Sequence, residues 1–209
     1  CRDEPVMRRC MAVLERRWND SAIGWFYRAE AHQRLQESDA CIAGFTKVIE
    51  LAPDRLSGYR SRADARVRRG ELKLALADYD RALACEDDGS AVSTLFNRAV
   101  AHDQLGNAEA VMADLARAIA LRPDHPAAYE WRSRRYFVMR KWKLSERDVD
   151  RVIELQGPDV ALLWRRGRCR RLLGDVEGAL TDYRALLAMA SEHAPALRET
   201  GRVLARAGR

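Results

Sequence analysis

The sequence predicts an all-α fold in which antiparallel helix pairs repeat along the chain. The clearest pair lies within residues 57–88, where Tyr59, Ala63 and Val67 share one helical face. Gly70 interrupts that face, and a second apolar stripe with helical spacing follows it. One such pair cannot bury both of its apolar faces, so it needs further copies of itself stacked alongside.

The same chemistry returns at a spacing of about 34 residues on both sides of this pair. Upstream, Trp25 takes the place of Tyr59. Downstream, the pattern resumes after two inserted residues, Ser90 and Ala91. We therefore divide the chain into five repeats, 22–55, 56–89, 92–125, 126–159 and 160–193, with single helices at 1–21 and 194–209 that serve as partial repeats or caps.

This pattern resembles the tetratricopeptide repeat family, whose motif is W-x2-L-G-x2-Y, then A-x3-F, then P. The residues that carry the motif are Trp25, Cys41, Phe45 and Pro53 in the first repeat, Gly70, Ala75 and Tyr79 in the second, and Gly167, Gly174, Ala179 and Tyr183 in the fifth. The resemblance implies a right-handed α-solenoid, a superhelix of helix pairs that binds other proteins.

Small residues stand where the two helices of a pair are expected to cross most closely. Ala63 faces Ala75 in the second repeat, and Gly167 is the corresponding residue in the fifth. A larger side chain at such a crossing would force the helix axes apart. The fourth repeat departs most from the pattern, because it has Arg140 where a glycine usually turns the chain and Gly157 where a proline usually closes the repeat.

Composition sets limits on the class of protein. The chain has 209 residues, 33% of them charged, with a net charge of +6 and a pI near 9.3. Only four lysines occur, so the excess is arginine, which a GC-rich genome also favours; the charge is therefore weak evidence for nucleic-acid binding. No apolar run approaches the length of a membrane span.

The five cysteines do not form a C-x-x-C pair, and their number is odd. Cys41 and Cys85 lie on the predicted apolar stripes, where a reduced cysteine acts as a small hydrophobe. These features favour a reducing cytoplasm. The alternative is a bacterial envelope protein that is lipid-anchored through Cys1.

We find no sequence motif of a catalytic, metal or cofactor site. H-E-x-x-H, G-x-S-x-G, the P-loop and G-x-G-x-x-G are all missing from the sequence. The sequence therefore predicts a protein that is not an enzyme and needs no cofactor or metal.

Arginine occupies the seventh position of every repeat. These residues are Arg28, Arg62, Arg98, Arg132 and Arg166, and the residues 16 positions later are Gly44, Asp78, Asp114, Asp148 and Asp182. The offset places each aspartate on the other helix of the same pair. We predict four partly buried Arg–Asp pairs within these helix pairs, or else that each aspartate meets the arginine of the neighbouring repeat. Such pairs would fix the register of the two helices more than they stabilise them.

The resemblance implies that the fifth, ninth and twelfth positions of each first helix line a concave, ligand-binding groove. In this sequence those positions carry mixed charges in the first half and mainly arginine in the second half. The predicted peptide-binding residues are Trp131, Arg134, Phe137, Trp164, Arg165, Arg168, Arg171, Arg198 and Arg202. Their side chains are expected to face solvent and to bind an acidic, extended or helical peptide through Arg–carboxylate bonds and aromatic anchors.

Two alternatives remain open at this stage. The arginines could only hydrate an open helix face, or the groove could bind RNA nonspecifically, although the fifth positions form no base-reading code. The carboxylate clamp of chaperone-binding family members is incomplete. Arg60 and Asn97 match it, whereas Asp64, Ala127 and Trp131 do not. A role at the acidic C-terminus of a heat-shock chaperone is therefore not predicted.

Overall fold

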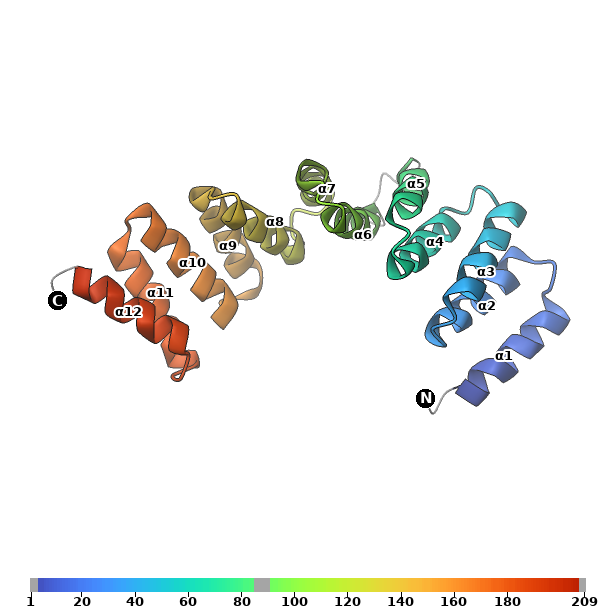
Figure 1. Ribbon diagram of the computed structural model, residues 1–209, viewed down its shortest axis with the longest axis horizontal. Helices are drawn as coiled ribbons and strands as arrows, with labels where there is room; N and C mark the ends of the chain where they lie inside the picture. The colour runs from blue at the N-terminus through green and yellow to red at the C-terminus, as the bar shows by residue number, and fades with distance from the viewer. Residues whose placement is uncertain (1–3, 85–90, 207–209) are drawn as a thin grey trace. The chain divides into compact units, whose positions relative to one another are not determined.

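The computed structural model describes residues 4–84 and 91–206, and within these ranges every regular element is an α-helix (Figure 1). The helices are α1 (Glu4–Arg17), α2 (Ala22–Arg34), α3 (Ser38–Leu51), α4 (Leu56–Arg69), α5 (Leu72–Leu83), α6 (Ala91–Gln104), α7 (Ala108–Leu121), α8 (Pro126–Val138), α9 (Trp142–Gln156), α10 (Val160–Leu173), α11 (Val176–Met189) and α12 (Ala194–Arg206). The predicted all-α solenoid of antiparallel helix pairs is confirmed. None of the described helices combines the length and apolar character needed to cross a membrane.

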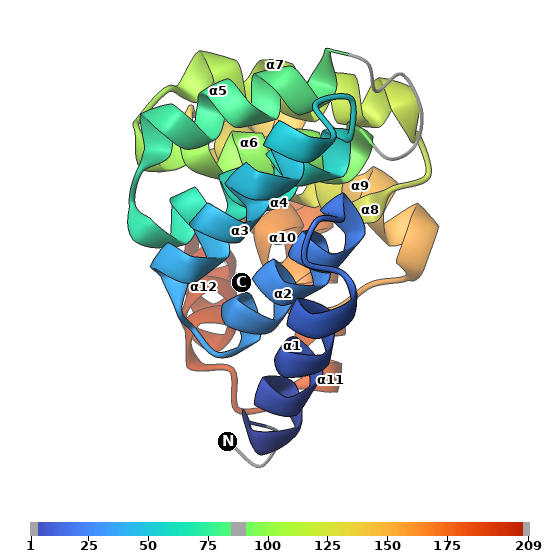
Figure 2. The same cartoon turned by 90° about the vertical axis from the view of Figure 1, so that its right-hand side faces the viewer.

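The helices pack as consecutive pairs, α2 with α3, α4 with α5, α6 with α7, α8 with α9 and α10 with α11 (Figure 2). The chain divides into two compact bodies, an N-terminal body of Cys1–Leu121 and a C-terminal body of Arg122–Arg209. Within each body, the second helix of one pair also packs on the first helix of the next, as α3 does on α4 and α9 on α10. This nearest-neighbour packing is what a solenoid requires.

The turn inside each pair uses a left-handed residue at one repeated position. Gly70, Gly106 and Gly174 have φ values of 78°, 76° and 87°, whereas Gln36 and Arg140 hold the same position at 62° and 58°. Arg140 therefore makes the turn of the fourth repeat without the glycine that this conformation favours. A residue with a Cβ atom pays about 1 kcal/mol for that conformation.

The helix crossings leave no room for larger side chains. Ala63 and Ala75 are fully buried, and so is Ala179. A Cβ atom added to Gly167 would lie 2.6 Å from Cε1 of Tyr183, a distance that packed atoms do not adopt. The predicted crossings are therefore confirmed at these positions.

Both ends of α10, the helix with most of the predicted binding residues, are well defined. The Asp159 side chain accepts a hydrogen bond of 2.7 Å from the backbone N–H of Leu162, which caps the N-terminus. Gly174 ends the helix in the left-handed conformation. The arginines of α10 are therefore held on a rigid element.

Candidate functional site

The four predicted Arg–Asp pairs all form, each between the two helices of one pair. The bonds from Nε and Nη2 to the two carboxylate oxygens are 2.9 and 2.7 Å for Arg62–Asp78, 3.0 and 2.5 Å for Arg98–Asp114, 2.7 and 2.7 Å for Arg132–Asp148, and 3.0 and 2.6 Å for Arg166–Asp182. The side chains of these aspartates are only 1–5% exposed. The prediction is confirmed, and the planar guanidinium matches each carboxylate with two parallel bonds.

Arg28, the seventh residue of the first repeat, has Gly44 16 positions later, where the other four arginines have an aspartate. A Cβ atom on Gly44 would lie 2.8 Å from Cβ of Ala29, so the crossing excludes any acidic side chain there. Arg28 instead lies over the ring of Trp25, with Cζ 3.6 Å from the ring centroid, and donates to Oδ1 of Asn19 at 3.3 Å. A cation–π contact thus replaces the ion pair in the first repeat.

Two of the pairs recruit a second arginine one helical turn further along. Arg66 donates to Asp78 at 2.7 Å, and Arg170 donates to Asp182 at 3.0 Å. Arg170 also donates to Glu146 at 3.0 Å and so joins α10 to α9. These arginines are engaged in holding the scaffold together.

Arg168, on α10, is held by aromatic rings instead of a carboxylate. Its Cζ atom lies 4.6 Å from the ring centroid of Phe137 on α8 and 5.6 Å from that of Trp164. Among the described residues, no carboxylate lies within ion-pair distance of this guanidinium. The cation–π contacts restrict the movement of this side chain.

Arg165 lies one turn before Arg168 and is half-buried. It donates from Nη1 to Oγ of Ser133 at 3.1 Å, and that hydroxyl donates to the backbone oxygen of Glu130 at 2.7 Å. Burial, followed by the positive charge of Arg134, lowers the pKa of the Arg165 guanidinium. The positive charges of Arg134 and Arg165 thus repel one another, and binding of an anion near them would relieve this repulsion.

The remaining predicted arginines differ in whether they are already paired. Arg134 pairs with Glu130 one turn away on α8. Glu199 on α12 lies 3.0 Å from Nε of Arg171 and 2.9 Å from Nη1 of Arg202. The expectation that Arg171 faces solvent is wrong, because its side chain is only 26% exposed and lies against this carboxylate. Arg198 is exposed.

We call Arg134, Arg165, Arg168, Arg171, Arg198 and Arg202 together the arginine face of the C-terminal body. The predicted aromatic anchors beside it also have packing roles. The Trp164 ring lies 5.7 Å from that of Tyr183 and 5.4 Å from that of His193, and the Phe137 ring lies 5.0 Å from that of Trp142. Trp131 is half-buried. These rings support the face more than they project from it.

Comparisons with known proteins agree with this architecture. Tetratricopeptide repeat models match residues 92–125 and 161–191. Among solved structures, the chain is similar to YrrB, described as a TPR protein with an unusual peptide-binding site, at 16% identity and a TM-score of 0.73, covering 91% of this chain and 97% of that one. It is also similar to a tetratricopeptide repeat protein from Parabacteroides merdae ATCC 43184 (16% identity, TM-score 0.74, 90% and 73% covered). A third similar structure is PilW, a type IV pilus biogenesis factor (19%, 0.69, 95% and 90%).

The chain contains tetratricopeptide repeats. No curated protein sequence matches it, so the low-identity structural likenesses bear on the fold alone. The position of each side chain in its repeat nevertheless allows the two bodies to be compared residue by residue.

The N-terminal body has a polar site at the ninth position of a repeat, where the C-terminal body has Arg168. Oδ1 of Asp64 accepts hydrogen bonds from the hydroxyl of Tyr79 at 2.5 Å and from Nδ2 of Asn97 at 2.9 Å. Burial and the charge of Asp64 both raise the pKa of the Tyr79 phenol. The sequence predicts for Asp64 and Asn97 only that they belong to an incomplete clamp. The signal for this site is the tyrosine on the facing helix.

Tyr183 is the counterpart of Tyr79 in the fifth tetratricopeptide repeat. Its side chain is fully buried, and its hydroxyl donates to no acceptor among the described residues. Burial raises the pKa of this phenol to about 12. A buried donor without an acceptor is uncommon in native proteins and marks a place where an acceptor would be favourable.

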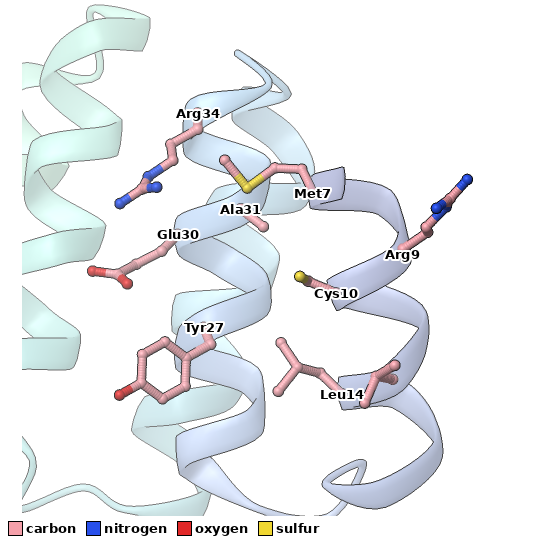
Figure 3. A pocket seen from close by; sticks show the side chains of 9 residues that line it. Met7, Arg9, Cys10, Leu14, Tyr27, Glu30, Ala31 and Arg34 are labelled. Carbon is pink, nitrogen blue, oxygen red and sulfur yellow. The ribbon is translucent and has the colours of Figure 1, made fainter. Parts of the chain in front are cut away.

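A separate, mostly apolar hollow of about 560 Å³ lies between α1 and α2 of the N-terminal body. Met7, Cys10 and Leu14 point from α1 toward α2, whereas Arg9 points away (Figure 3). The hollow contains none of the predicted binding residues. It exposes the Cys10 thiol, whereas Cys41 and Cys169 are buried.

Proposed function

We propose that this protein is a non-catalytic protein-interaction scaffold whose C-terminal body binds an acidic peptide segment through the arginine face. The observation that carries the proposal is Arg168, which is fixed between Phe137 and Trp164 without a carboxylate of its own among the described residues. A guanidinium stacked in this way has lost much of its rotational freedom, so it can form two bonds to a carboxylate at little further entropic cost.

The neighbours of Arg168 support the same ligand chemistry. Arg165 is half-buried and donates a hydrogen bond to the neutral hydroxyl of Ser133. The carboxylates of Glu130 and Glu199 already pair with Arg134, Arg171 and Arg202 on this face. The face therefore accepts carboxylates of the chain itself, which supports an acidic peptide as its ligand.

The test is a direct binding measurement with one charge reversal and a matched control. Arg168→Glu is compared with Arg147→Glu, an exposed arginine on α9 that lies outside the arginine face. The probe is a fluorescein-labelled ten-residue polyglutamate peptide, followed by anisotropy. Loss of a charge-assisted bidentate contact should weaken binding by about tenfold or more in the first variant and little in the second.

Two results would overturn the proposal. Equal binding by Arg168→Glu and Arg147→Glu would mean that these arginines only hydrate the helix surface. Binding of a polyuridine probe in place of the peptide, with affinity falling steeply as salt rises, would favour the RNA-binding alternative. Melting curves of both variants should match that of the wild type, which excludes unfolding as the cause.

A further inference from the structure

We propose that Arg171, Arg202 and Tyr183 form a carboxylate-binding subsite that the chain fills with its own Glu199, so that an acidic ligand must displace Glu199 to use it. This inference rests on the proposed function and names the residue that limits ligand binding. The ligand group would be a carboxylate, from either an acidic side chain or the C-terminus of a peptide.

The first observation is the convergence of two arginines on one carboxylate. Glu199 lies on α12, and its oxygens lie 3.0 Å from Arg171 on α10 and 2.9 Å from Arg202 on α12. The Glu199 side chain is 15% exposed, whereas that of Arg202 is 72% exposed. Arg171, Glu199 and Arg202 line a cavity of about 610 Å³, so a carboxylate can reach the two arginines from solvent.

The second observation is that Glu199 leaves the buried hydroxyl of Tyr183 without an acceptor and pairs with Arg171 in poor hydrogen-bond geometry. Nε of Arg171 lies 3.0 Å from Glu199 without the alignment of a hydrogen bond, and the hydroxyl of Tyr183 donates to no acceptor among the described residues. The charges of Arg171 and Glu199 both act on the Tyr183 phenol, so these groups are neighbours. A buried hydroxyl without an acceptor costs free energy, and a better-placed carboxylate would recover it.

The N-terminal body supplies an example of such a placement. Asp64 accepts the hydroxyl proton of Tyr79, and it also accepts a bond from Asn97 on the next first helix. Glu199 occupies the same sixth position of a repeat as Asn97, and Tyr183 the same position as Tyr79. At the ninth position Arg168 replaces Asp64, so in the C-terminal body the carboxylate for the tyrosine must come from elsewhere.

The experiment removes the charge of Glu199 without changing its shape. Glu199→Gln is compared with Glu154→Gln, which makes the same change in net charge on α9, where Glu154 pairs with Arg151 at 2.9 Å. Binding of the polyglutamate peptide should tighten about threefold or more in Glu199→Gln and remain unchanged in Glu154→Gln. The double variant Glu199→Gln/Arg171→Gln should lose the gain, because the freed arginine is gone.

Two peptide forms distinguish the sources of the carboxylate. A C-terminally amidated polyglutamate peptide offers only side-chain carboxylates, whereas an alanine–serine peptide with a free C-terminus offers only the terminal one. The form that gains affinity in Glu199→Gln identifies the source. As a second probe of the subsite, Arg202→Gln should weaken binding of that form, and its exposed side chain makes unfolding no concern.

The outcomes separate this inference from the proposed function. If wild type binds the peptides and Glu199→Gln binds them no better than Glu154→Gln, the subsite is overturned and the proposed function stands. If the gain survives Arg171→Gln, the subsite is overturned as well. If neither wild type nor Glu199→Gln binds either peptide, both proposals fail.

Discussion

The helix pairs α4–α5 and α10–α11 share a framework and differ at one decisive position. Both have an aspartate that two arginines clamp across the pair, followed by a buried tyrosine. The corresponding residues are Arg62 and Arg166, Arg66 and Arg170, Asp78 and Asp182, and Tyr79 and Tyr183. At the ninth position, however, α4 has Asp64 and α10 has Arg168. The buried Arg–Asp pairs are thus the same in both helix pairs. The charge beside the tyrosine differs, because it is negative at Asp64 and positive at Arg168.

The largest expected effect tests the shared framework. Asp182→Ala leaves Arg166 and Arg170 without their buried carboxylate, and should lower the free energy of unfolding by about 3–5 kcal/mol. Asp78→Ala should cost a similar amount. The control, Asp150→Ala, removes a 39%-exposed partner of Arg166 and should cost less than about 1 kcal/mol. Urea unfolding followed by circular dichroism measures all three, and equal losses for Asp182 and Asp150 would refute the shared role.

The next effect tests the difference between the two tyrosines. Tyr79→Phe removes a hydrogen bond to the carboxylate of Asp64 and should destabilise the protein by about 1–2 kcal/mol. Tyr183→Phe removes a hydroxyl that donates to no acceptor, so stability should stay within about 0.5 kcal/mol of wild type or rise. Equal losses in the two variants, again by urea unfolding, would mean that Tyr183 has an acceptor in solution.

The pKa of Tyr183 gives this difference a pH dependence. Because burial raises its pKa from 10.0 to about 12, the folded state disfavours the phenolate relative to the unfolded state. The resulting stability is fully present below pH 10 and is lost as the pH rises from about 10 to 12. Between these pH values, Tyr183→Phe should lose less stability than wild type does. Parallel pH profiles for the two proteins would contradict the shift.

A smaller effect extends the comparison to the turn of the fourth repeat. Arg140→Gly should raise the free energy of unfolding by about 0.5–1 kcal/mol, because glycine adopts the positive φ of 58° without strain. The reverse change, Gly174→Ala, places a Cβ atom at a φ of 87° and should cost about 1 kcal/mol. Thermal unfolding of both variants provides the measurement. A loss in Arg140→Gly would show that its side chain contributes more than the strain costs.

The smallest effect concerns reactivity instead of stability. A maleimide should label Cys10 in the folded protein well before Cys41 or Cys169, because only Cys10 is exposed and burial raises the pKa of the other two thiols. Peptide mass spectrometry after timed quenching assigns each site, and Cys1 and Cys85 lie outside the described residues. Simultaneous labelling of Cys10 and Cys169 would indicate that α10 opens readily.

The sequence predicted those features that depend on spacing alone. A fixed offset of 16 residues was enough to predict four ion pairs, since the repeat geometry brings those two positions together every time. Glu199 escaped prediction because an acidic ligand implies arginines and aromatic residues in its site, and spacing does not show that a carboxylate of the chain itself pairs with them. The capture of Arg168 by Phe137 and Trp164 also escaped, because side-chain stacking depends on rotamers that no periodicity encodes.

The nearly complete burial of the Arg–Asp pairs has a consequence for how the protein responds to salt. Dissolved ions screen charges that they can surround, with a range of about 8–10 Å at physiological strength, but they cannot surround carboxylates that are 1–5% exposed. The exposed arginines have no such protection. Raising ionic strength should therefore release an acidic partner while the helices stay folded. A high-salt wash of the immobilised protein should then elute a captured partner without unfolding the protein.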